Sequence, residues 1–117
     1  MQEVYIVSVA RTPIGSLGGV LSGVTAVELG KIAVQAAMER AGVNGKQIDE
    51  VYMGNVLQAN VGQAPAQQVS IAAGIATTTP CTTVNKVCSS GMKAIMLGAQ
   101  SIMLGDNQVV VVGGMES

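Results

Sequence analysis

The residues best suited to chemistry in this chain surround Cys88, in the stretch VNKVCSSGMKAI at positions 84 to 95. The cysteine lies between a strand-like run and a predicted helix, and Ser89, Ser90 and Gly91 are small enough to leave its sulfur open to a reactant. The N–H groups and the positive dipole end at the start of a helix stabilise an anion, which favours the reactive thiolate. Two amides of the turn could also bind the oxyanion formed from a thioester.

Three other roles for Cys88 compete with that of a nucleophile. A disulfide to Cys81 is disfavoured, because seven residues of extended chain span about 23 Å, whereas bridged Cα atoms lie within ~7 Å. A metal site is disfavoured too, because the chain has no histidine and no CxxC pair. An unreactive buried cysteine is the commonest state of a free cysteine. The residues alone leave that role open beside the nucleophilic one.

The charge and composition exclude some functions and predict a covered surface. Six basic and seven acidic residues give a net charge of −1, and aromatic residues make up only 2%. Nucleic-acid binding is therefore not expected, since it needs a basic groove and aromatic platforms. Charged residues make up 11%, against roughly 25% in an ordinary domain, and hydrophobic residues make up 49%. We expect the resulting apolar surface to be covered by a second copy or by further sequence.

Two elements are predicted in the first part of the chain. Residues 4 to 10 favour a strand because β-branched side chains dominate them. A helix is predicted over residues 24 to 42, where Thr25 and Glu28 have the spacing of a capping box. Gly42 is placed to end that helix in the left-handed conformation. The helical period predicts an apolar stripe, formed by Leu29, Ile32, Ala33 and Ala36.

The remaining elements alternate between strands and helices. A strand is predicted over residues 48 to 57, a short helix ending at Gly74, and a long helix over residues 89 to 104. The valine run at residues 109 to 112 suits a strand buried on both faces, as in a parallel sheet. This alternation predicts a layered α/β fold. One face of the long helix carries Met92, Met96 and Met103. We expect this face to pack in the core or against another subunit.

The start of the chain indicates an intracellular setting. The opening stretch MQEVYIVSVARTP lacks the basic residues and the longer apolar block of a signal peptide. No apolar run approaches the ~18 residues of a membrane helix, so no membrane partner is expected. With two cysteines we expect a reducing compartment, the cytoplasm or, in a eukaryote, an organelle matrix.

Four segments together resemble the thiolase family, in order and over the whole chain. They are VARTPIGSLGG at 9 to 19, VLQANVGQAPAQQ at 56 to 68, the Cys88 region at 85 to 106, and VVVVGGMES at 109 to 117. The stretch TPCTTVNKVCSSGMKAIM is most similar to the acetyl-CoA acetyltransferase branch of that family. One departure is Gln67, where relatives commonly carry Arg.

The resemblance implies a thiolase-like α/β/α fold with a mixed, mostly parallel sheet and a buried helix bearing the nucleophile. It implies that Cys88 takes an acyl group from an acyl-CoA thioester. A second acetyl-CoA then attacks in a Claisen condensation to acetoacetyl-CoA, and the reverse reaction is thiolysis of a 3-ketoacyl-CoA. No metal or redox cofactor is implied, since coenzyme A arrives with the substrate. A homodimer or homotetramer is expected.

The resemblance also indicates what residues 1 to 117 lack. Family members use a histidine and a second cysteine from the C-terminal half, whereas this chain has no histidine and Cys81 is expected to be a packing residue. We therefore expect an incomplete N-terminal thiolase domain, without its C-terminal half and CoA-binding loop region, that is inactive when isolated. Alternatives are a non-catalytic thiolase-like fragment or association module, and a longer-chain 3-ketoacyl-CoA thiolase. A ketoacyl synthase fits the flanking residues less well.

Four residues near Cys88 have supporting roles to be tested. Asn85 and Lys86 could either form a polar strand end or position the turn that carries the cysteine. Met115 and Glu116 follow the last strand, and we expect them to pack behind that turn and support it.

Overall fold

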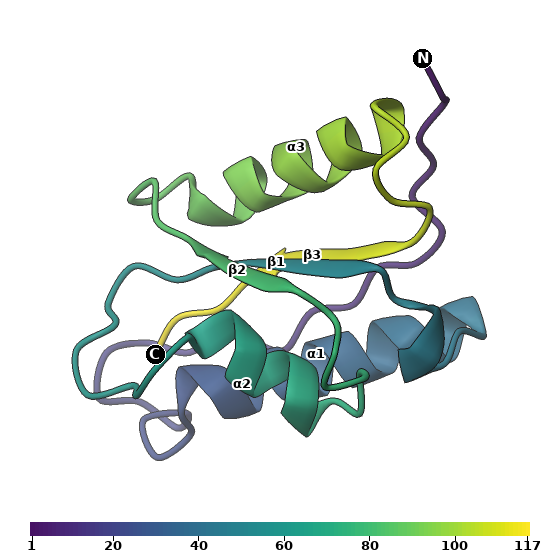
Figure 1. The fold of residues 1–117 in the computed structure, drawn as a ribbon. Coiled ribbons are helices and arrows are strands. Elements are labelled where there is room, and N and C mark those ends of the chain that lie inside the picture. The colour runs from purple at the N-terminus through teal and green to yellow at the C-terminus, as the bar shows by residue number, and fades with distance from the viewer.

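The computed structural model describes all 117 residues and places helices on both faces of a parallel sheet (Figure 1). Its three strands stand in the order β2-β1-β3, and both neighbouring pairs are parallel. Helix α3 covers one face, and α1 and α2 cover the other. The layered α/β/α prediction is thereby confirmed. In chain order the elements are α1 (Ala26–Ala41), the 3-10 helix η1 (Gly45–Gln47), β1 (Glu50–Gly54), α2 (Pro65–Ala72), β2 (Cys81–Val84), α3 (Ser90–Met103) and β3 (Val110–Gly114).

Helix α1 begins and ends as its sequence predicts. The Glu28 amide donates to Thr25 Oγ1 at 3.1 Å, and the Thr25 amide donates to Glu28 Oε2 at 3.1 Å, which completes the capping box. Gly42 adopts the left-handed conformation with φ 69° and ψ 28°, and its amide donates to the Glu39 carbonyl. These local signals are strong because they satisfy backbone groups that the helix ends leave unpaired.

The predicted apolar stripe of α1 is wrong in register. Ile32 is 53% exposed, and the buried positions are Ala26, Gly30, Val34 and Met38. At Gly30 an added Cβ would lie 2.9 Å from Met115 Sδ and 3.0 Å from Val69 Cγ2. Helix α1 therefore approaches its neighbours closely at Gly30, and the larger Val34 and Met38 are buried further along the same face.

The predicted strand at residues 4 to 10 is wrong as well. The segment pairs with no strand, and Ile6 and Val9 are 79% and 71% exposed. Its one long-range hydrogen bond is from Arg40 Nη1 to the Val9 carbonyl, and just before the segment the Gln2 amide donates to the Met103 carbonyl. β-branched residues favour a pleated, half-buried surface, but that preference produces a strand only beside a partner.

Strand β1 is the centre of the sheet and of the core. Val51 and Met53 are 0% and 2% exposed. Before β1, the carboxylate of Asp49 accepts hydrogen bonds from the amides of Gln108 and Val109, and these bonds lower the pKa of Asp49. Asp49 thus links the residues that precede β3 to the start of β1.

The other predicted strands and helices correspond to β1, α2, α3 and β3. Strand β3, however, is a half-buried edge strand rather than one buried on both faces.

Helix α3 turns its small residues to the sheet and its large apolar residues outward. Its buried positions are Ser90, Ala94, Gly98 and Ser101. The assignment of its apolar face to the core of this chain is wrong, because Met92, Met96 and Met103 are 67%, 46% and 40% exposed. A subunit contact stays a prediction. No helix of the structure has both the length and the apolar character that a membrane crossing needs.

Replacing Gly98 by alanine tests the close packing of α3 on β3. A Cβ there would lie 2.3 Å from Val112 Cγ1 and 3.2 Å from Val110 Cγ2. Alanine favours a helix by about 1 kcal/mol over glycine, but overpacking costs roughly 1–3 kcal/mol. We expect Gly98→Ala to lower the free energy of unfolding by about 1 kcal/mol in urea titrations. Gly23→Ala is the matched control, since nothing lies within 4 Å of its added Cβ. Unchanged or higher stability of Gly98→Ala would contradict this packing.

Candidate active site

Cys88 is exposed in the turn that joins β2 to α3. The long helix was predicted over residues 89 to 104, and in the structure Ser89 is its N-cap and Ser90 its first residue. The thiol lies in a hollow of about 540 Å³ at the carboxyl ends of the strands. Open parallel sheets bind ligands at this edge. The other residues that line the hollow are Gly54, Val56, Leu57, Val87, Ser90, Gly91, Gly114, Met115 and Glu116.

Glycines let the start of α3 rest directly on the sheet backbone. A Cβ on Gly54 of β1 would lie 2.5 Å from the carbonyl carbon of Ser90. A Cβ on Gly114 of β3 would lie 3.2 Å from the Cα of Gly91. Because backbone atoms cannot move aside as a flexible side chain can, Gly54 must be glycine, whereas the contact at Gly114 is tight. The contact fixes the height of the Cys88 turn above the sheet.

The turn is held by hydrogen bonds from its own side chains. Asn85 Oδ1 accepts from the Val87 amide at 3.0 Å, so Asn85 positions the turn, which was one of its two predicted roles. Ser90 Oγ accepts from the Lys86 amide at 2.8 Å and donates to the Val87 carbonyl at 2.6 Å. Ser89 Oγ donates to the Lys86 carbonyl at 2.8 Å. Lys86 takes part through its backbone.

Val87, directly before the cysteine, has a strained backbone. Its φ of 50° lies in the left-handed region, which β-branched residues rarely occupy. Such conformations cost about 1–3 kcal/mol and persist where surrounding contacts enforce them. The turn hydrogen bonds and the glycine contacts supply that enforcement here. Sequence reasoning missed this feature because valine is among the residues least expected at positive φ.

Several amides around Cys88 are free to bind an anion. The amides of Ser89 and Ser90 donate to the carbonyls of Lys86 and Val87. Those of Cys88, Gly91 and Met92 donate to no protein atom, as expected of N–H groups at a helix start. Three amides close to Cys88 along the chain therefore have no acceptor within the protein.

Two polar residues tie the strand ends together below the turn. Asn55 follows β1 and is 0% exposed; its amide donates to the Val84 carbonyl at 3.0 Å, and its Nδ2 donates to the Met115 carbonyl at 3.1 Å. Asn55 Oδ1 has no hydrogen-bond partner. Sequence reasoning missed Asn55, although a polar residue directly after an apolar strand is a usable signal. Glu116 accepts hydrogen bonds from the amides of Val56 and Leu57, so its bonds hold the segment after β1 rather than the Cys88 turn that it was expected to support.

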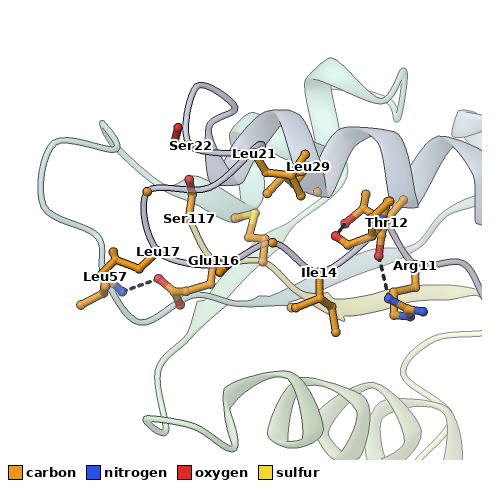
Figure 2. Close-up of a pocket in the computed structure, with 18 of the residues that line it drawn as sticks. Arg11, Thr12, Ile14, Leu17, Leu21, Ser22, Leu29, Leu57, Glu116 and Ser117 are labelled. Carbon is orange, nitrogen blue, oxygen red and sulfur yellow. Dashed lines mark hydrogen bonds between the residues drawn. The ribbon is translucent and has the colours of Figure 1, made fainter.

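A second and larger hollow, of about 740 Å³, shares Glu116 with the hollow of Cys88 (Figure 2). The loop at residues 10 to 18, helix α1 and the C-terminal residues line it. Figure 2 shows the Glu116 carboxylate at its edge, bonded to the amide of Leu57. Glu116 lines both this hollow and the hollow of Cys88, as do Leu57, Gly114 and Met115.

The other candidates are not assembled around Cys88. Cys81 is half-buried in β2, its Sγ contacts the Thr79 carbonyl at 3.4 Å, and both cysteines are free, so a disulfide is absent. Its predicted packing role fits this placement. No three His, Cys, Asp or Glu side chains are grouped to hold a metal ion. Gln67 is exposed on α2.

The family model for the N-terminal domain of thiolases matches residues 4–117. This chain is 62% identical, over its whole length, to the mitochondrial acetyl-CoA acetyltransferase of Xenopus tropicalis and covers 28% of that protein. It is 56% identical to the human mitochondrial acetyl-CoA acetyltransferase, covering 27%, and 60% identical to a cytosolic one of Gibberella zeae, covering 30%. The chain thus spans less than a third of these relatives.

A solved structure agrees with the sequence comparisons. The Acat5 thiolase of Ascaris suum, crystallised in complex with coenzyme A, superposes with a TM-score of 0.95 at 45% identity. The superposition covers 97% of this chain and 30% of that one.

Replacing Val87 by glycine tests the strain beside Cys88. Glycine occupies the left-handed region without a Cβ penalty, and Val87 is 66% exposed, so little packing is lost. We expect Val87→Gly to raise the free energy of unfolding by about 1 kcal/mol in denaturant titrations. Val20→Gly, at a position 97% exposed and without positive φ, is the control and should bring no gain. A loss of stability in Val87→Gly would show that the valine backbone is not strained.

Proposed function

Because this chain belongs to the thiolase family, we propose that Cys88 is the acyl-accepting nucleophile of an acetyl-CoA acetyltransferase. One observation carries the proposal. An exposed cysteine lies in a hollow beside unpaired helix-start amides, within a chain that is 56% to 62% identical to acetyl-CoA acetyltransferases. An inert packing cysteine would be buried and would not need a strained turn.

In the first proposed step, the thiolate of Cys88 attacks the carbonyl carbon of acetyl-CoA. A carbon–sulfur bond forms to the enzyme, and the carbonyl oxygen becomes an oxyanion. The unpaired amides of Cys88 and Gly91 are suited to donate to that oxygen. When the oxyanion collapses, the bond to coenzyme A breaks and its thiolate leaves and takes up a proton. The product is an acetylated Cys88, which divides one difficult reaction into two easier ones.

In the second proposed step, a second acetyl-CoA loses a proton from its methyl group. The resulting carbanion attacks the acetyl carbonyl on Cys88, so that a carbon–carbon bond forms and the Cys88 thiolate is released. The product is acetoacetyl-CoA, and the reverse sequence is thiolysis of a 3-ketoacyl-CoA. The chain itself supplies no histidine, and Cys81 lies half-buried in β2. We therefore place the base for the methyl proton and the group that activates Cys88 outside residues 1 to 117.

Residues 1 to 117 are proposed to form the first part of a thiolase domain. The chain covers 27% to 30% of its relatives, and its apolar residues remain uncovered on the outer face of α3 and at residues 4 to 10. Coenzyme A acts as part of the substrate in this proposal, and no separate cofactor is needed. Association into a homodimer or homotetramer would cover further apolar surface. The relatives carry mitochondrial and cytosolic names, which suits the cytoplasm or an organelle matrix as the compartment.

Removal of the Cys88 sulfur tests the proposed role directly. In the full-length polypeptide that contains this chain, Cys88→Ala should lower the rate of acetoacetyl-CoA thiolysis by at least about a thousandfold, because no acyl-enzyme can form. Cys81→Ala is the matched control, since its half-buried sulfur bonds only the Thr79 carbonyl. It should retain most of the activity. Intact turnover in Cys88→Ala would rule out the nucleophilic role.

The separated 117 residues provide a second test. Without a histidine or a second cysteine in the hollow, they should show no thiolysis of acetoacetyl-CoA above the uncatalysed rate. Spectrophotometric assay of the purified chain checks this expectation. Measurable turnover by this chain alone would show that the remaining groups are not needed.

A further inference from the structure

The segment that leaves β1 is held between the ends of the neighbouring strands. The regular pairing of β1 with β3 ends at Gly54 and Gly114, and one more backbone bond follows, from the Met115 amide to the Gly54 carbonyl at 2.9 Å. Beyond it, the side chain of Asn55 donates to the Met115 carbonyl at 3.1 Å. Side chains therefore continue the link between the two strands after the sheet has ended.

Glu116 completes this link with both oxygens of its carboxylate. Its Oε1 accepts from the Val56 amide at 2.8 Å, and its Oε2 accepts from the Leu57 amide at 2.9 Å. Hydrogen bonds to an ionised acceptor are shorter and stronger than those between neutral groups. Two consecutive amides bound to one carboxylate leave this stretch of backbone little freedom to rotate. Figure 2 shows the Leu57 bond and the position of Glu116 at the boundary of the neighbouring hollow.

The clamped residues form part of the hollow in which Cys88 lies. Val56, Leu57 and Glu116 line the same 540 Å³ hollow as the cysteine. Leu57 is 66% exposed, so packing of its own side chain does little to hold it in place. The position of this wall depends on the carboxylate bonds instead. A thioester bound in the hollow would rest against it.

We infer that Glu116 is a positioning residue for acyl transfer to Cys88, because its carboxylate fixes the Val56–Leu57 wall of the nucleophile hollow. The inference rests on the proposed function, since the wall matters only if a thioester is placed against the sulfur. A misplacement of about 1 Å can slow a reaction by as much as a hundredfold, although no reacting group is lost. Glu116 touches neither the sulfur nor the reacting carbonyl in this role.

Replacement of Glu116 by glutamine separates positioning from chemistry. Gln keeps the size of the side chain but places an NH₂ donor where a second acceptor oxygen is needed, against a backbone N–H. In the full-length polypeptide, we expect Glu116→Gln to slow acetylation of Cys88 by acetyl-CoA about tenfold, measured by rapid quench and mass spectrometry. Alkylation of Cys88 by iodoacetamide should be unchanged, because this small reagent does not need the wall. The thermal midpoint should also stay close to that of the parent.

Two further variants sharpen the result. Glu116→Asp keeps the charge on a shorter side chain and should give an intermediate acetylation rate. Glu39→Gln makes the same chemical change at an exposed position of α1 and should leave both reactions at the parental rate. Acetylation of Glu116→Gln at the parental rate would overturn the inference. Parallel losses of acetylation, alkylation and thermal stability would overturn it too, because they indicate a folding role. Failure of the unmodified parent to acetylate Cys88 would refute the proposed function itself.

Discussion

The site depends on the direct contact between the start of α3 and the carboxyl ends of β1 and β3. Gly54, Gly91 and Gly114 meet there. Backbone atoms of Ser90 and Gly91 already occupy the space that a Cβ on Gly54 would need, and a Cβ on Gly114 would lie 3.2 Å from the Cα of Gly91. This contact leaves the chain little room between the end of β2 and the first turn of α3. The strained φ of Val87 and the bonds from Asn85 and Ser90 are the local solution to that constraint. Its consequence is an exposed Cys88 beside unpaired amides.

The same demand for close approach explains how apolar residues are distributed. Helix α1 buries Ala26 and Gly30 together with Val34 and Met38. Helix α3 turns only glycine, alanine and serine towards the sheet, so its larger side chains must point elsewhere. On α3 these side chains form an exposed apolar face, and residues 4 to 10 present another. Exposed apolar area of this kind is typical of surfaces that another chain or segment covers. The low share of charged residues, 11%, has the same physical meaning.

The sequence was informative where a local pattern specifies its own geometry. The capping box of Thr25 and Glu28, the left-handed Gly42 and the extent of α3 all depend on neighbours along the chain, and all were confirmed. The strand at residues 4 to 10 and the buried faces of α1 and α3 depend on partners in space, and those predictions were wrong. Cys88 could be found from its small neighbours. Asn55 could have been noticed as a polar residue directly after an apolar strand, although only the packed strand ends reveal its bonds. The strain of Val87 could not be foreseen, because only the packed turn reveals it.

The central claim is that Cys88 carries an acyl group during turnover. Incubation of the full-length polypeptide with acetyl-CoA, followed by acid quench, digestion and peptide mass spectrometry, tests it most directly. Acetyl is expected on the peptide that contains Cys88 and not on Cys81, and addition of coenzyme A should remove it. A peptide with unmodified Cys88 from a sample that is actively turning over would contradict the claim.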